Sequence, residues 1–306
     1  MTTSRRAVLQ GALALAAAGA VPGRILHAAV SPPLTRAIPK TGEQIPLVGL
    51  GSWITFNVGN DRALLDECTR VVAAFFAAGG RMLDSSPMYG SSQPTIGYAL
   101  KKLGHPKPLF SAEKVWISNA SRGPTQMDRS RAYWGVPRFD LMQVHNLLSW
   151  ERHLETLEAM KADGRVRYIG ITTSEGRRHR DFIKVMATRP LDFVQVSYNI
   201  VDREVERRIL PLARERGIAV IVNRPFQQGD LVKAVEKKPL PPWLAETGAR
   251  TWPQFLLKFI VSHPAVTCAI PATSRVAHVE ENMAAARGVL PDEALRRRMA
   301  AYVGQL

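Results

Sequence analysis

Residues 79–90, "GGRMLDSSPMYG", contain the pattern that decides the fold. Two glycines end an apolar helical stretch, a short apolar strand follows, and the strand ends at Asp84. Pro87 and Gly90 then turn the chain, because proline presets φ and glycine tolerates positive φ. Taken alone, the stretch is equally compatible with an Asx-type turn that carries Tyr89 on the surface.

The same order of parts, a short apolar strand, a turn and a helical stretch, recurs along the chain. Residues 150–165 and 204–217 are two of the helical stretches, and Gly164 and Gly217 end them, as glycine often does. Strands that alternate with helices indicate a parallel sheet, and eight such units predict an α/β fold, a closed (β/α)8 TIM barrel. The expected strands are residues 46–53, 81–86, 109–116, 139–145, 167–173, 193–199, 218–225 and 266–272.

A doubly wound open sheet is the alternative arrangement of such units. The glycine-rich strand exit at residues 49–53, "GLGSW", lacks the GxGxxG spacing of a dinucleotide-binding sheet. The barrel is therefore the preferred prediction.

Polar side chains occur at or near the carboxyl ends of the expected strands. In a TIM barrel these ends meet at one face, where active sites lie. Each group alone is compatible with a satisfied polar residue in the core, but their recurrence from strand to strand favours one common site. The residues are Asp84, Lys114, His145, Thr172, Thr173, Gln195, Asn223, Arg224 and Thr273.

Tyr89 follows the turn after Asp84 and is expected to lean over this face. Beside the ammonium of Lys114, its phenol is expected to ionise below the usual pKa of about 10, which would make it a proton donor near neutral pH. Asp84 is expected to hold Lys114, and His145 to orient a carbonyl oxygen. A carbonyl polarised in this way is ready to accept a hydride, which no side chain supplies, so a cofactor is required.

These motifs resemble the aldo-keto reductase family over nearly all of the chain after about residue 40. Residues 45–53 are similar to the opening strand of the family, and residues 79–100 to the segment that carries its aspartate and tyrosine. "SAEKVW" (111–116) carries the matching lysine, and "FDLMQVHNL" (139–147) the matching histidine. Residues 263–283 resemble the end that clamps the cofactor.

The resemblance implies reduction of an aldehyde or ketone to an alcohol, with Tyr89 as proton donor. It favours NADP(H) as the cofactor, with NAD(H) as the alternative, and a small-molecule carbonyl as the substrate. A nucleotide-binding redox sensor that docks a partner and turns over little is the alternative function. The implied catalytic residues are Asp84, Tyr89, Lys114 and His145; the implied cofactor contacts are Ser52, Thr172, Thr173, Gln195, Asn223, Arg224, Thr273, Arg275, Glu281 and Asn282; and Trp53 and Trp116 are implied for the substrate pocket.

The chain departs from the family pattern at several of its cofactor positions. Asn223 replaces an aromatic residue that stacks on the nicotinamide, and Phe226 is the expected substitute. Ala272 replaces a lysine that often neutralises the 2′-phosphate, and His278 stands where arginine is common. Arg275 remains to contact that phosphate, because a guanidinium suits it.

Residues 1–30 are expected to be a targeting segment, ahead of a barrel of residues 31–306. Paired arginines, Arg5 and Arg6, precede an Ala-rich apolar run and then small residues, which resembles a twin-arginine-type signal peptide. The alternative is a frayed Ala-rich helix. The prediction implies the twin-arginine export machinery as a partner and a periplasmic or exported protein. The apolar run is too short to span a bilayer, so no stable membrane anchor is expected after cleavage.

The composition excludes some other classes of protein. The 306 residues carry a formal net charge of +15, which favours anionic partners. The basic residues are scattered, however, and form no nucleic-acid motif, so we expect a basic solvated surface, with weak attraction to anionic membranes as the alternative. Cys68 and Cys268 have no metal-ligand spacing, so no metal site is predicted, and both are expected to be buried thiols.

Overall fold

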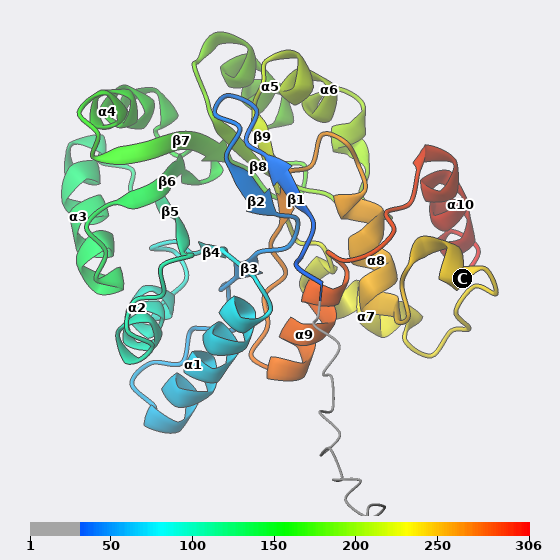
Figure 1. The fold of residues 1–306 in the computed structure, drawn as a ribbon. Helices are drawn as coiled ribbons and strands as arrows, with labels where there is room; N and C mark the ends of the chain where they lie inside the picture. The colour runs from blue at the N-terminus through cyan, green and yellow to red at the C-terminus, as the bar shows by residue number, and fades with distance from the viewer. Residues whose placement is uncertain (1–30) are drawn as a thin grey trace, which may run out of the picture. The chain divides into compact units, whose positions relative to one another are not determined.

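The computed structural model describes residues 31–306, in which eight parallel strands form a barrel with helices between them (Figure 1). Each strand pairs with the next one in chain order. The predicted (β/α)8 barrel is confirmed, and every expected strand overlaps an observed one. The strands are β3 (Leu50–Gly51), β4 (Met82–Asp84), β5 (Phe110–Val115), β6 (Phe139–Val144), β7 (Val166–Thr172), β8 (Phe193–Ser197), β9 (Ala219–Asn223) and β10 (Cys268–Ala269).

The barrel closes where its first and last strands meet, which we call the seam. Parallel bridges there join Val48 to Ala269 and Gly51 to Ala272. The backbone N–H of Gly49 donates to the carbonyl of Ala269 at 2.8 Å. A side chain at Gly51 would not fit, because a Cβ atom would lie 2.7 Å from a backbone oxygen of the opposite edge.

The helices follow the strands as the sequence predicts. Asp61 caps the first of them by accepting from the backbone N–H groups of Ala63 and Leu64. Gly164 and Gly217 both have positive φ just beyond helices, where a side chain would be strained. The α-helices described are α1 (Arg62–Ala77), α2 (Ser92–Lys102), α3 (Gly123–Trp134), α4 (Trp150–Ala162), α5 (His179–Thr188), α6 (Ile209–Glu215), α7 (Asp230–Val235), α8 (Trp252–Val261), α9 (Val276–Ala284) and α10 (Glu293–Val303).

A short hairpin of β1 (Thr35–Ala37) and β2 (Gln44–Pro46), which the sequence analysis does not predict, lies across the barrel (Figure 1). Its turn carries Glu43, which pairs with Arg167 and accepts from the Tyr168 hydroxyl at 2.9 Å. These three residues, which we call the floor cluster, lie at the amino-terminal ends of the strands. The hairpin therefore closes the end of the barrel opposite to the carboxyl ends of the strands.

The remaining expectations about composition concern thiols, metals and membranes. Cys68 and Cys268 are buried free thiols, as predicted. Between residues 31 and 306 no cluster of three or more His, Cys, Asp or Glu side chains is placed to hold a metal ion. None of the helices in that range is long and apolar enough to cross a membrane. The predicted signal peptide lies outside the described residues.

Candidate active site

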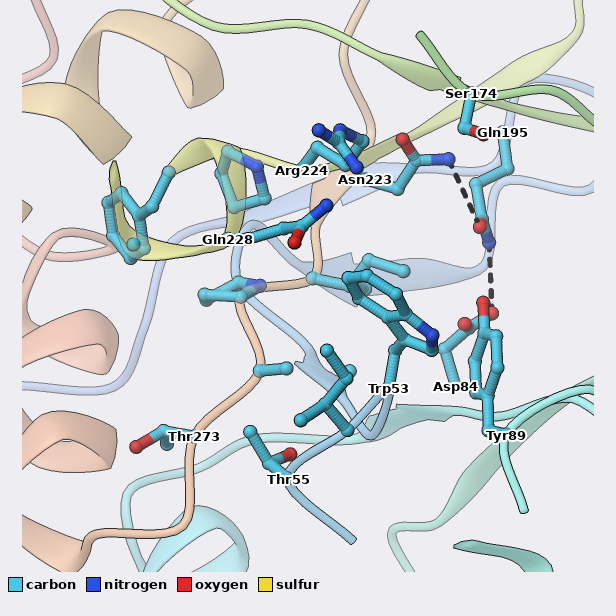
Figure 2. Close-up of a pocket in the computed structure, with 18 of the residues that line it drawn as sticks. Trp53, Thr55, Asp84, Tyr89, Ser174, Gln195, Asn223, Arg224, Gln228 and Thr273 are labelled. Atoms are coloured by element: carbon cyan, nitrogen blue, oxygen red, sulfur yellow. Dashed lines mark hydrogen bonds between the residues drawn. The ribbon is translucent and has the colours of Figure 1, made fainter. Parts of the chain in front are cut away.

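A cavity of about 500 Å³ opens at the carboxyl ends of the strands (Figure 2). Its size is within the range of small-molecule and cofactor sites. The structure brings together in its wall most of the residues that the sequence analysis selects. They are Trp53, Asp84, Tyr89, His145, Thr172, Gln195, Asn223, Arg224, Thr273, Glu281 and Asn282, together with Phe226 and His278.

Some of the selected residues do not line the cavity. The hydroxyl of Ser52 donates to the backbone oxygen of Asp84 at 2.8 Å, and the hydroxyl of Thr173 donates to the backbone oxygen of Arg177 at 2.5 Å. Both hydroxyls therefore bond to the backbone next to the cavity and support its wall, rather than facing the cavity. Arg275 immediately precedes α9.

The structure also places Trp116 outside the cavity lining. Its side chain is exposed, at 39%, and its ring centroid lies 6.5 Å from that of His145. Its backbone is held by Gln126, whose amide bonds both its N–H and its carbonyl. Trp116 therefore neighbours the site at its rim, while Trp53 lies within it.

Lys114 and Asp84 form a buried ion pair beneath the cavity. The Nζ of Lys114 lies 2.5 Å from Oδ1 of Asp84 and also donates to the backbone oxygen of Ser85 at 2.8 Å. Gln195 donates to the other carboxylate oxygen of Asp84 at 2.9 Å. Burial opposes the charge on Lys114 and is the largest single influence on it. The attraction and hydrogen bond of Asp84, together with the attraction of Tyr89 and Glu113, outweigh burial, so the pKa of the lysine is raised and it stays protonated.

Tyr89 lies between this ion pair and His145. The Nζ of Lys114 is 5.2 Å from the centroid of the Tyr89 ring, and the ring of His145 meets it edge-on at 5.7 Å between centroids. The expectation of a lowered pKa is wrong. Burial raises the pKa of Tyr89 to about 12, because it outweighs the opposing charge of Lys114. The phenol is therefore protonated at neutral pH, the state that a proton donor needs.

His145 directly follows β6 and is neutral. Burial, and then the charge of Lys114, lower its pKa well below 6.5. Its Nδ1 lies 2.7 Å from the hydroxyl of Ser86. Ser86 is not predicted from the sequence, although this serine stands inside the turn between Asp84 and Tyr89.

Glu113 is a second residue that the sequence analysis does not select. It precedes Lys114 on β5, so its side chain points to the opposite face of the strand, between barrel and helices. Its carboxyl accepts from Gln93 and Trp134, each at 2.9 Å, and burial raises its pKa to about 7. Because side chains alternate along a strand, the sequence itself indicates that Glu113 points away from the face that carries Lys114.

Amide side chains form one wall of the cavity. Figure 2 shows Gln195 between Asn223 and Asp84, and Asn223 donates to Gln195 at 3.4 Å. The hydroxyl of Ser197 donates to the Asn223 oxygen at 2.7 Å, which fixes that amide. Arg224, next along the chain, pairs with Glu175 at 2.8 Å. The wall therefore presents amide donors and acceptors in fixed orientations.

The mouth of the cavity is apolar. Trp53, Ile54 and Met88 line it, and the side chain of Ile54 is exposed, at 60%. Ile54 also has a φ of 64°, a strained conformation for a β-branched residue. Strain of this kind persists where the surrounding structure imposes it, and it is commonest at ligand sites.

The chain matches the family model of the aldo/keto reductase family over residues 47–302. Methylglyoxal reductase YeaE of Escherichia coli is 24% identical over 245 residues, which cover 78% of this chain and 85% of that protein. The NADH-specific methylglyoxal reductase of the same organism is 25% identical over 230 residues, 63% of this chain and 68% of that protein.

The fold is also similar to solved structures. An aldo/keto reductase from Klebsiella pneumoniae, in complex with NADP and acetate, superposes with a TM-score of 0.74 at 20% identity, covering 90% of this chain and 96% of that one. At such identity the likeness shows the fold alone. The family match spans most of the chain and all four residues of the Asp84, Tyr89, Lys114 and His145 group. The chain therefore belongs to the aldo-keto reductase family.

Proposed function

We propose that this protein reduces an aldehyde or ketone to an alcohol, with NADP(H) as the favoured cofactor and NAD(H) as the alternative. The observation that carries the proposal is the meeting of Tyr89 and His145 at one cavity above the Lys114–Asp84 pair. A protonated phenol and a neutral imidazole can both donate to one carbonyl oxygen.

The residues present fit a nicotinamide nucleotide. The fixed amides of Gln195 and Asn223, with Thr172, offer the donors and acceptors that a carboxamide needs. Phe226 adds an aromatic face to the same cavity. The cofactor would supply the hydride.

The phosphate end of the nucleotide fits the region where α9 begins. Thr273, Glu281 and Asn282 line the cavity there, and the amino terminus of a helix favours an anion. Arg275 directly precedes the helix, and His278 lies in its first turn. Because one histidine and one arginine replace a denser basic cluster, NADP(H) is favoured but NAD(H) is retained as the alternative.

The chain's own groups would divide the work of the reaction. His145 would orient the carbonyl oxygen, and Tyr89 would give that oxygen its proton. The ammonium of Lys114 would then stabilise the phenolate left on Tyr89, and Asp84 would keep that lysine in place and charged. Because Lys114 is wholly buried, its charge acts with little screening.

The natural substrate would be a small carbonyl with an apolar body. Trp53, Ile54 and Met88 at the mouth support this part of the proposal. Two curated relatives are methylglyoxal reductases, so a small 2-oxoaldehyde belongs in the same test panel as aromatic aldehydes.

A single-turnover experiment tests the proposal. The protein is loaded with NADPH, a panel of aldehydes and ketones is added, and the loss of reduced-cofactor fluorescence is followed; the series is repeated with NADH. Rapid loss with some carbonyls is expected. Tight NADPH binding with no loss across the panel would contradict the proposal and favour a redox sensor that docks a partner.

We also propose that residues 1–30 direct export through the twin-arginine machinery, and that the nucleotide is bound before export. The paired Arg5 and Arg6 and the Ala-rich run support the first part. Protein from the periplasmic fraction is expected to lack residues 1–30 and to carry about one nucleotide per chain. An Arg5→Lys, Arg6→Lys variant is expected to remain in the cytoplasm. Recovery of uncleaved wild-type protein in the cytoplasm would overturn the proposal.

A further inference from the structure

The hydroxyl of Ser86 occupies an unusual position beside the site. It is fully buried and lies 2.7 Å from Nδ1 of His145. The backbone N–H of Met88 donates to the same oxygen at 3.2 Å. These are the hydrogen bonds of that hydroxyl within the described chain.

Counting protons assigns the direction of the bond to His145. The Ser86 oxygen already accepts from Met88, and its single proton needs an acceptor. Nδ1 of His145 is the acceptor within reach among residues 31–306. If Nδ1 carried a proton instead, the Ser86 hydroxyl would be a buried donor without a partner, which is unfavourable.

We infer that Ser86 is a positioning residue that fixes the tautomer of His145. Nδ1 accepts from Ser86, so the proton of the neutral ring is on Nε2, the nitrogen that Ser86 does not engage. His145 lines the cavity, and Nε2–H is then the donor available to a carbonyl oxygen there. The effect on catalysis rests on the proposed function, whereas the tautomer does not.

Because His145 is neutral, its tautomer decides whether it can donate to a carbonyl oxygen. A doubly protonated ring donates from both nitrogens, but a neutral one donates from a single nitrogen. Burial keeps this ring neutral. Without Ser86, no group among residues 31–306 hydrogen-bonds to Nδ1 and selects the tautomer that donates toward the cavity. The opposite tautomer would present a lone pair to the carbonyl oxygen.

The neighbouring Ser85 provides a matched control. It is equally buried and lies in the same turn, but its hydroxyl is bonded to Ser92 at 2.9 Å rather than to His145. Ser85→Ala and Ser86→Ala therefore remove the same atom from adjacent positions. Only Ser86→Ala should change the tautomer of the His145 imidazole.

The direct test is nitrogen NMR on the full chain labelled with ¹⁵N-histidine, the His145 signals being assigned by their loss in His145→Gln. In the wild type and in Ser85→Ala, His145 is expected to be protonated on Nε2 and not on Nδ1. In Ser86→Ala it is expected to show a mixture of tautomers. Protonation on Nδ1 in the wild type, or an unchanged tautomer in Ser86→Ala, would overturn the inference.

Kinetics then connect the tautomer to the reaction. Ser86→Ala is expected to lower kcat roughly ten- to a hundredfold with an unchanged KM for NADPH, whereas Ser85→Ala and Ser86→Thr keep most of the activity. Equal losses in Ser85→Ala and Ser86→Ala would show a structural role of the turn and overturn the catalytic part. If the NMR result is as expected but no carbonyl is reduced even by the wild type, the proposed function fails while the tautomer assignment stands.

Discussion

The two ends of the barrel carry chemically similar groups with different surroundings. At the carboxyl ends of the strands, Tyr89 faces Lys114 at 5.2 Å, beside a carboxylate. At the amino ends, Tyr168 faces Arg167 at 5.1 Å, also beside a carboxylate, Glu43. Tyr89 lines a cavity, whereas the Tyr168 hydroxyl donates to Glu43 under the hairpin.

The difference shows that surroundings, rather than residue types, define the site. In the floor cluster the groups bond to one another, and the cation is 31% exposed in its side chain. At the other end the cation lies wholly buried beneath the cavity, and the phenol faces space that a reactant can enter. Two matched pairs of variants, one single variant and one pH profile test this contrast.

The tyrosines should differ most. Tyr89→Phe is expected to lower the rate of carbonyl reduction by about 10²–10⁴-fold, the usual contribution of a general acid. Tyr168→Phe should leave the rate within about twofold, because that hydroxyl has no access to the cavity. Single-turnover fluorescence measures both. Equal rates in the two variants would remove the functional distinction between the ends.

The cations should differ in stability. Lys114→Met leaves Asp84 charged and buried without its partner, which is expected to cost about 3–5 kcal/mol in urea unfolding. Arg167→Met removes a partly exposed cation and is expected to cost about 1 kcal/mol. A smaller loss for Lys114→Met than for Arg167→Met would contradict the contrast in burial.

The floor carboxylate should act on stability alone. Burial opposes the charge on Glu43, but the hydrogen bond from Tyr168 and the charge and hydrogen bonds of the neighbouring arginines outweigh it and lower the pKa of this carboxyl. A lowered folded-state pKa stabilises the fold above the unfolded pKa of about 4.5, and this stabilisation is lost as the pH falls through the folded pKa. Glu43→Gln should therefore cost about 1 kcal/mol at neutral pH, less in acid, and no activity. A change in kcat would show coupling between the two ends.

The pH profile should show the smallest effect. The pKa of Tyr89 is raised to about 12 and that of His145 is lowered well below 6.5, so neither titrates near neutrality. The single-turnover rate should change less than about threefold between about pH 7 and pH 10. A fall in rate with a midpoint below about pH 9 would mean that the phenol ionises there and that the charge of Lys114 outweighs burial.

The sequence predicts the barrel and the four central residues because both depend on order along the chain. Strand ends recur at regular spacing, so Asp84, Lys114 and His145 could be placed on one face. Burial depends on packing between distant segments and is not readable in this way, which is why the expected pKa of Tyr89 was wrong. The hairpin of β1 and β2 was missed because strands of three residues carry too little alternation.

The same limit applies to the supporting residues. Ser86 acts through His145, 59 positions away, and Glu113 is bonded to side chains on two helices. The resemblance implies Trp116 for the substrate pocket, but the direction of a side chain at a strand exit depends on the loop that follows. Contacts across the fold decide these roles.

The seam has a consequence for the life of the protein. Gly51 and Ala272 lie on its two sides, and both line the cavity. The two strands that meet at the seam, β3 and β10, have only two residues each. A ligand that contacts both of them would add contacts across the seam and stabilise it. Because such a ligand binds only the closed barrel, it would raise the free energy of unfolding. Ligand-bound molecules would then resist heat and proteolysis better than ligand-free molecules. The occupancy of the cavity would then determine how long each molecule stays folded.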